Sequence, residues 1–292
     1  MRKISTLILI AMLLAVFVPV SPVTAQEAVP QVVLDRIEAY GELIPELDHY
    51  NTLNVEAFAE LLIEEPDVVI VDVREVAELE EGGTIEGAVH IPLRTLGENL
   101  DLLPDTEATL VVVCKGGTRA TIAMTTLHIL GYENAHVLVG GFDAWVAEDM
   151  PVVEEAAEVE AGEMPDIDEE LVEYVAEYLA ELPEGFGGVG ANALFEEMFE
   201  TMPDYLIDVR SDEEWADPGY IDGAEHLWIN EFIQNLDEWP EDLDANIVVY
   251  CASGYRGNIA ATVMGMMGYE NVRNMSGGAN AWVAEGLPLV TS

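Results

Sequence analysis

The feature that most constrains this chain is an internal repeat, in which the same motifs recur in the same order along its 292 residues. The segment Gly-Tyr-Glu-Asn begins at Gly131 and again at Gly268, and Gly-Gly-x-x-Ala-Trp-Val-Ala-Glu begins at Gly140 and again at Gly277. Asp-Val-Arg and Gly-Ala-x-His also occur twice, and the distance along the chain between their two copies is nearly the same as for the first two segments. A repeat this long is the size of a domain, so the sequence predicts two copies of one domain.

The boundaries of the two domains follow from the repeat. We expect the first domain at residues 30–153 and the second at 167–292, joined by an acidic linker at 154–166 that lacks strand or strong helix patterning. Each domain begins with a predicted helix. The acidic helix from Asp168 to Leu182 has apolar residues at helical spacing and is expected to pack on its own domain.

Within each copy, short apolar runs alternate with helical periodicity, which indicates an α/β domain. We therefore predict a mostly parallel central sheet flanked by helices on both faces. The predicted buried strands are Val68–Val71, Leu110–Val113, Tyr205–Ile207 and Ile247–Tyr250, and the predicted helices after the second strand of each copy are Thr121–Leu130 and Asn258–Met267.

The N-terminus resembles a signal peptide at residues 1–25. Basic Arg2 and Lys3 precede an apolar run from Ile4 to Val20, and small residues end at Ala25. We expect cleavage, export and no membrane association afterwards. The alternative is an uncleaved N-terminal membrane anchor, because the apolar run is nearly long enough to span a bilayer.

The chain is strongly acidic, with 57 acidic and 10 basic residues and a formal net charge of −47. Such a charge disfavours nucleic acid as a partner and favours a solubilising surface. The alternative is a cationic partner or surface.

Two cysteines, Cys114 and Cys251, each directly follow a predicted buried strand and open a loop into a helix. The loops consist of Cys114, Lys115, Gly116, Gly117, Thr118 and Arg119, and of Cys251, Ala252, Ser253, Gly254, Tyr255 and Arg256. Ligands bind at the carboxyl ends of such strands, and loop N–H groups with a helix N-terminus favour an anion. We therefore expect the pKa of both thiols to fall. A disulfide between them is the alternative in an exported protein.

The pattern Cys-x-x-Gly-x-Arg after a strand, with Asp-Val-Arg and Gly-Ala-x-His before it and Gly-Gly-x-x-Ala-Trp after it, resembles the rhodanese family. The resemblance covers about 100 residues in each copy, and implies a sulfurtransferase in which a cysteine takes sulfane sulfur from a donor such as thiosulfate. It implies Cys114 and Cys251 as catalytic residues and the rest of both loops as substrate-binding residues. Two-domain members keep a working cysteine only in the second domain, whereas both loops have one here.

The resemblance implies no cofactor or metal, and a small sulfur anion and a thiol or other thiophile as the partners. His90 and His226 match a structural turn of the family rather than metal or dyad residues. Trp145 and Trp282 are expected to be core anchors. Asp72, Arg74, Asp208 and Arg210 match the Asp-Val-Arg motif, whose role is chiefly structural.

Two other functions stay open. A non-catalytic module could bind a partner or store persulfide. A cysteine phosphatase or arsenate reductase would use similar thiolate chemistry, but those phosphatases have five residues between cysteine and arginine, whereas both loops have four. Lys115 suits a dianionic donor, so we expect Cys114→Ser to remove more thiosulfate activity than Cys251→Ser.

Overall fold

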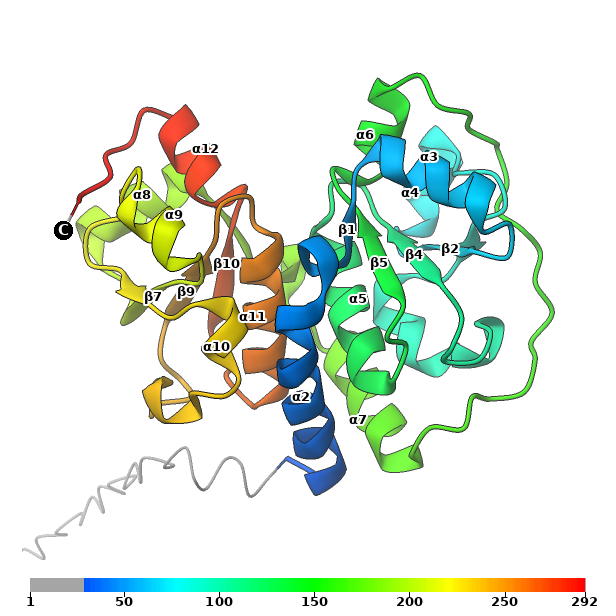
Figure 1. The fold of residues 1–292 in the computed structure, drawn as a ribbon, viewed down its shortest axis with the longest axis horizontal. Helices are drawn as coiled ribbons and strands as arrows, with labels where there is room; N and C mark the ends of the chain where they lie inside the picture. Colours follow the sequence, from blue (N-terminus) through cyan, green and yellow to red (C-terminus); the bar gives the residue numbers. More distant parts are fainter. Residues whose placement is uncertain (1–28, 292) are drawn as a thin grey trace, which may run out of the picture.

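The computed structural model describes residues 29–291, which form two units of the same topology (Figure 1). The predicted signal peptide, residues 1–25, lies outside the described residues. The first unit contains α2 (Gln31–Leu43), β1 (Thr52–Leu53), α3 (Val55–Glu64), β2 (Val69–Asp72), α4 (Val76–Gly82), β3 (Val89–His90), the 3-10 helix η3 (Leu93–Glu98), β4 (Leu110–Val113), α5 (Thr118–Leu130), β5 (Ala135–Leu138) and α6 (Gly141–Ala147). The second contains α7 (Glu169–Ala180), the short turn η5 (Glu184–Gly187), β6 (Gly188–Gly190), α8 (Ala191–Glu200), β7 (Tyr205–Asp208), α9 (Asp212–Ala216), β8 (Glu225–His226), α10 (Ile229–Phe232), β9 (Ile247–Tyr250), α11 (Tyr255–Met266), β10 (Val272–Ser276) and α12 (Gly278–Ala284).

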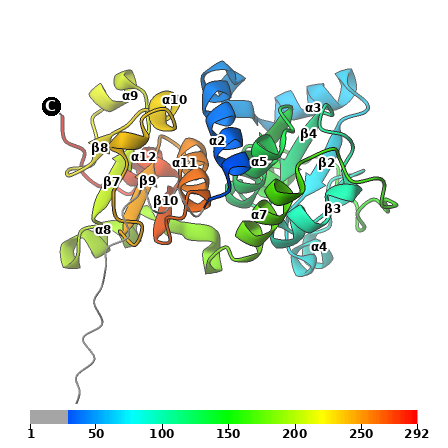
Figure 2. The same cartoon turned by 90° about the horizontal axis from the view of Figure 1, so that it is seen from below.

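Each unit is built on a five-stranded sheet in which every strand pairing is parallel. The strand orders are β1-β5-β4-β2-β3 and β6-β10-β9-β7-β8, so β4 and β9 lie at the centre of their sheets. Helices cover both faces of each sheet (Figures 1 and 2). The predicted α/β class is confirmed, and the predicted strands and helices match observed elements, with ends that differ by up to three residues.

The alternation of side chains along the central strands divides each unit into two cores. In β4, Val111 and Val113 pack with α3 and α6 on the outer face, whereas Leu110 and Val112 face α5 on the other side. That inner core continues through α5, α2, α7 and α11 to Ile247 of β9, so one apolar cluster is shared by both units. Figures 1 and 2 show these helices between the two sheets.

The prediction that α7 packs on its own domain was wrong, because its apolar face is buried mainly against η3 of the first unit. A methyl group at Gly97 of η3 would lie 2.7 Å from the Cα atom of Ala176 in α7, so the two backbones touch. Arg94 of η3 also donates to the carbonyl of Ala180 at 2.9 Å. The apolar spacing in the sequence therefore predicted correctly that one face of α7 is buried, but it did not identify the unit against which that face packs.

The predicted linker at 154–166 has neither helix nor strand. It lies against the first unit, since the amides of Ala157 and Gly162 donate to the carbonyls of Ala88 and Asp101. It runs along the outer edge of that unit in Figure 1. Of the helices within residues 29–291, none is long and apolar enough to cross a membrane.

Candidate active site

The two cysteines occupy equivalent places, each as the first residue after the central strand of its sheet. Cys114 follows β4 and Cys251 follows β9, and each loop leads directly into the helix that faces the other unit, α5 or α11. Both are free thiols and are buried, with exposures of 1% and 0%. The alternative of a disulfide between them is thus not the arrangement in this structure.

The fourth residue of each loop turns a backbone amide toward the sulfur. The N–H groups of Gly117 and Gly254 donate to the Sγ atoms of Cys114 and Cys251, both at 3.1 Å. These glycines have φ angles of 109° and 101°, in the left-handed region that side chains disfavour. Both loops have the same length, and each therefore needs glycine at this position to hold the sulfur.

The repeated Gly-Gly motif fixes the cysteine loop from the other side. At the start of α6, the amide of Phe142 donates to the carbonyl of Cys114 at 2.7 Å, and a side chain on Gly141 would collide with that same oxygen. Ala279 and Gly278 repeat this arrangement on Cys251. The motif is thus the site's backbone clamp, because it binds the carbonyls of the first two residues of each loop.

The environment of Cys114 differs from the expectation that its pKa would fall. Burial is the largest influence and raises the pKa of the Cys114 thiol above its ordinary value of 9.0, although Arg119 and the amides of Ala120, Gly117 and Gly116 act in the opposite direction. For Cys114 the expected lowering was wrong, because these amides and Arg119 do not offset the loss of water around a fully buried sulfur.

We expect Cys114 to be alkylated slowly near neutral pH and progressively faster as the pH rises past 9.0. The reason is that only the thiolate attacks, and burial keeps the thiol protonated at lower pH. The measurement is the rate of iodoacetamide addition to the Cys251→Ser protein between about pH 6 and about pH 10, followed by intact mass. A plateau reached below about pH 8 would contradict the raised pKa.

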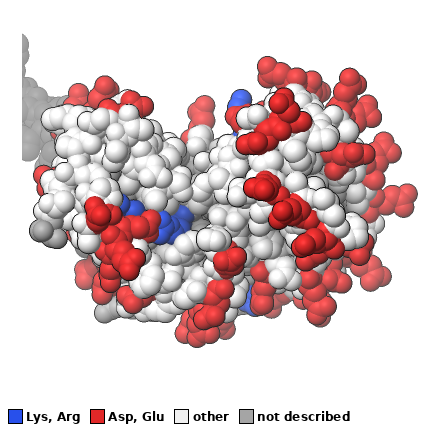
Figure 3. All heavy atoms as spheres, turned by 45° about the horizontal axis from the view of Figure 1, so that its top comes forward, with Lys and Arg blue, Asp and Glu red and all other residues white. Residues whose placement is uncertain are grey.

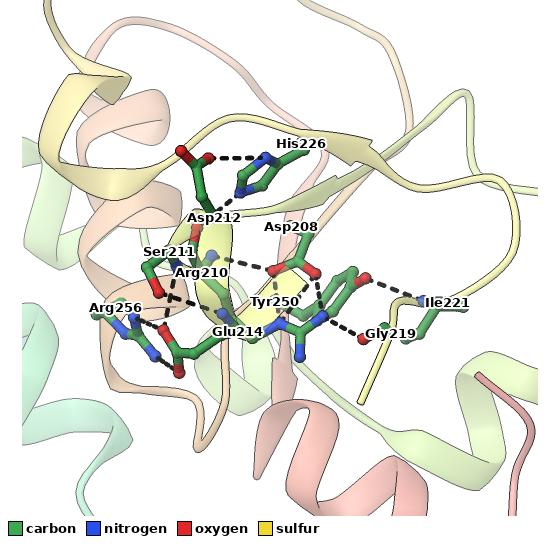
Figure 4. Close-up of polar contacts among 10 residues, drawn as sticks. All are labelled: Asp208, Arg210, Ser211, Asp212, Glu214, Gly219, Ile221, His226, Tyr250 and Arg256. Carbon is green, nitrogen blue, oxygen red and sulfur yellow. Dashed lines mark hydrogen bonds and ion pairs between the residues drawn. The ribbon is translucent and has the colours of Figure 1, made fainter. Parts of the chain in front are cut away.

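The loop arginines bind carboxylates rather than loop carbonyls. Arg119 donates to both oxygens of Glu78 in α4, at 2.5 and 2.7 Å, and Arg256 donates to both oxygens of Glu214 in α9, at 2.6 and 2.7 Å. Figure 4 shows the second of these pairs. Hydrogen bonds from the arginines are the main reason that the pKa values of Glu78 and Glu214 are lowered to about 2.

Glu78 and Glu214 are site residues that the sequence reasoning missed. Each is also the third residue of a helix capping box, with Glu75 or Ser211 at the N-cap. The signal was present in the repeat, since both copies read Asp-Val-Arg followed by a glutamate after three residues. Each glutamate ties the start of a helix to the cysteine loop.

The Asp-Val-Arg motif forms a buried ion pair in each unit, as the resemblance implied. Arg74 donates to both carboxylate oxygens of Asp72 and to the carbonyl of Gly83, and both charged side chains are buried. Figure 4 shows the same contacts for the pair in the second unit, which involves Asp208, Arg210 and Gly219. The motif thereby holds the loop that follows α4 or α9 against the end of its strand.

The two histidines and two tryptophans named in the sequence analysis contact backbone carbonyls, as expected for residues that stabilise the fold. The Nε2 atoms of His90 and His226 donate to the carbonyls of Arg74 and Arg210, at 2.7 and 2.8 Å. Trp145 and Trp282 are buried, and their indole N–H groups donate to the carbonyls of Pro151 and Pro288.

Cations are scarce on the surface, and Figure 3 shows carboxylates spread over one face with few basic groups visible. The described residues contain seven arginines and one lysine. Every one of the arginines donates to a carboxylate or a backbone carbonyl. Among the arginines and lysines of residues 29–291, Lys115 is the one whose side chain has no ion pair or hydrogen bond, and it is exposed in the first cysteine loop. It is the cation that remains available to an incoming anion.

Comparison with known proteins finds relatives of both repeats. The Rhodanese-like domain model matches residues 54–148 and 191–285. The chain is 33% identical over 102 residues to a sulfurtransferase of Allochromatium vinosum, a match that covers 35% of this chain and 92% of that protein. It is 36% identical over 87 residues to the thiosulfate sulfurtransferase GlpE of Haemophilus influenzae, covering 30% of this chain and 80% of the relative. The crystal structure of SseA from Escherichia coli, titled a 3-mercaptopyruvate sulfotransferase with the rhodanese fold, matches with 20% identity over 78% of this chain and 98% of that one, at a TM-score of 0.39.

Proposed function

Because this chain belongs to the family of rhodanese-like domain proteins, with two such domains in tandem, we propose that it carries sulfane sulfur as persulfides on Cys114 and Cys251. The proposed donor is a small sulfur anion such as thiosulfate, and the acceptor is a thiol or another thiophile. The sulfurtransferases among its relatives support sulfur transfer as the general activity. The donor and the persulfides on both cysteines are the part that we propose.

The proposed reaction needs no cofactor. A cysteine thiolate attacks the outer sulfur of thiosulfate, the S–S bond of the donor breaks, and sulfite leaves with the electron pair. The acceptor then attacks the outer sulfur of the persulfide, and the cysteine leaves again as a thiolate. No net oxidation or reduction of the protein occurs over the cycle.

One observation carries the proposal: in both loops a backbone amide points at the cysteine sulfur, at 3.1 Å. A preorganised amide stabilises negative charge on sulfur and on an outer sulfur attached to it. A cysteine buried only for packing would not require a left-handed glycine to bring that amide into place.

The experiment is incubation of the purified protein with thiosulfate, followed by intact mass measurement under non-reducing conditions. We expect an increase of about 32 Da for each cysteine that accepts sulfur, and its loss on adding cyanide. The Cys114→Ser/Cys251→Ser protein is the matched control. Absence of any adduct with thiosulfate, 3-mercaptopyruvate and polysulfide would reject the proposal.

The burial of both sulfurs favours a second candidate, in which the protein stores persulfide without turning over. The same mass experiment distinguishes the two. A storage protein would keep the added mass in the presence of cyanide or a small thiol, whereas a sulfurtransferase would release it within the time of the assay.

We also propose that the protein acts after export, on the strength of the basic and apolar pattern in residues 1–25. Cleavage would leave an N-terminus near Gln26, which N-terminal sequencing of the exported protein can check. Retention of Met1 in the membrane fraction would favour the anchored alternative.

A further inference from the structure

Tyr255 belongs to the second cysteine loop, but its side chain lies in the first site. Its hydroxyl accepts a hydrogen bond of 2.7 Å from the amide of Gly140, which immediately precedes α6 in the first unit. A methyl group built on Gly117, the sulfur-binding glycine of the first loop, would lie 2.6 Å from the same hydroxyl. The phenol therefore fills the space between the first cysteine loop and its Gly-Gly clamp.

The Tyr255 hydroxyl also has a proton that it can donate. The Gly140 bond uses the phenol oxygen as an acceptor, and no acceptor for its own proton is found among residues 29–291. The neighbouring Gly117 donates its amide to the sulfur of Cys114 at 3.1 Å. The phenol hydroxyl thus lies beside the glycine whose amide already binds the sulfur.

No residue of the first cysteine loop makes the corresponding contact with the second site among residues 29–291. Thr118 occupies in the first loop the place that Tyr255 has in the second, and its side chain is too short to cross between the units. The aromatic contacts of the loop arginines are reciprocal by comparison, since Phe186 of the second unit lies over Arg119 and Tyr50 of the first unit lies over Arg256, both at 5.5 Å. The extra donor is therefore particular to the Cys114 site.

We propose that Tyr255 donates a hydrogen bond to the anionic sulfur held on Cys114, so that a residue of the second loop completes the first site. This inference rests on the proposed function for the persulfide, and the phenol is also near enough to the bare Cys114 thiolate for their charges to interact. Burial is the main reason that the pKa of Tyr255 is raised, and charge on Cys114 and Cys251 adds to it. The phenol accordingly keeps its proton when the sulfur is negative, which is the state in which a donor is needed.

The test compares Tyr255→Phe with its parent in the Cys251→Ser protein, where Cys114 is the one remaining thiol. Phenylalanine keeps the ring and removes the donor. We expect iodoacetamide to add to Cys114 at least about threefold more slowly at a fixed pH near 8, because the thiolate is less favoured. We also expect the Cys114 persulfide, once formed, to be lost severalfold faster. Tyr255→Thr, which copies the first loop, should change both in the same direction.

Two controls separate this role from a general effect on the fold. Tyr50→Phe in the same background changes an aromatic at the second site, and should leave Cys114 alkylation unchanged. Tyr255→Phe in the Cys114→Ser protein should slow the alkylation of Cys251 by clearly less than it slows that of Cys114, because the hydroxyl lies at the first site. Equal slowing of both cysteines would mean that Tyr255 merely shapes its own loop, and would overturn the inference.

The outcomes also separate the inference from the proposed function. If Cys251→Ser protein takes up no sulfur from any donor, the proposed function fails at Cys114, while the alkylation rates still decide whether Tyr255 acts on that sulfur. If sulfur is taken up and neither Tyr255→Phe nor Tyr255→Thr changes alkylation or persulfide loss, the inference fails and the proposed function stands.

Discussion

Replacing both Cys114 and Cys251 by serine is expected to lower thiosulfate-dependent sulfur transfer by at least about 10³-fold, to the level of the buffer. Serine preserves the size of the side chain and can still accept the Gly117 or Gly254 amide, so the loops should stay in place. The hydroxyl is far less acidic and less nucleophilic than a thiol. The measurement is thiocyanate formation from thiosulfate and cyanide, with circular dichroism to confirm the fold.

The single variants are expected to differ from each other. Lys115 is exposed in the first loop and free of ion pairs among residues 29–291, whereas Ala252 and Ser253 leave the second loop without a free cation. A dianionic donor should therefore reach Cys114 more readily, so Cys114→Ser should lose more thiosulfate activity than Cys251→Ser. The raised pKa of Cys114 opposes this order, and the opposite order near neutral pH would mean that burial outweighs Lys115.

Asp72→Asn is expected to destabilise the protein by about 3–5 kcal/mol, with a fall in melting temperature of roughly 10 °C. The carboxylate is completely buried, and it accepts hydrogen bonds from both Arg74 and Thr84. Asparagine has nearly the same shape but leaves the buried guanidinium of Arg74 without a counter-charge. Urea and thermal unfolding followed by circular dichroism measure the change.

The second unit provides an internal repeat of this experiment. Asp208 is buried in the same way against Arg210, so Asp208→Asn should cost about as much. Glu80→Gln is the matched control, because it neutralises an exposed carboxylate of α4 near the motif and should change the stability by less than about 0.5 kcal/mol. A loss below about 1 kcal/mol at Asp72 would show that the ion pair is dispensable.

The sequence was sufficient to predict the features that depend on local chemistry. Apolar runs bounded by turn residues predicted β4 and β9, and each cysteine was placed correctly at the end of its central strand. These predictions succeeded because each depends on a few neighbouring residues and on rules that apply wherever the segment lies.

The predictions that were wrong, and the contacts that were missed, all depend on residues that are distant in the sequence and close in the fold. The apolar face of α7 predicts that the helix is buried but does not identify η3 as its partner. The sequence of the first cysteine loop likewise does not identify Glu78 as the partner of Arg119. The pKa of Cys114 depends on how completely the other unit and the loop exclude water. Tyr255 was placed in the second loop by its sequence, yet its hydroxyl reaches the first site.

Because the apolar cluster that runs through α5, α2, α7 and α11 is shared by both units, we expect the two units to fold as one cooperative unit. A chain cut between residues 153 and 154 would take α7 away from η3 and expose the inner faces of both halves to water. The complete protein should accordingly unfold in a single thermal transition rather than in two. We therefore expect that neither copy keeps an independent stability, so that a destabilising mutation in one copy should weaken both cysteine loops at once.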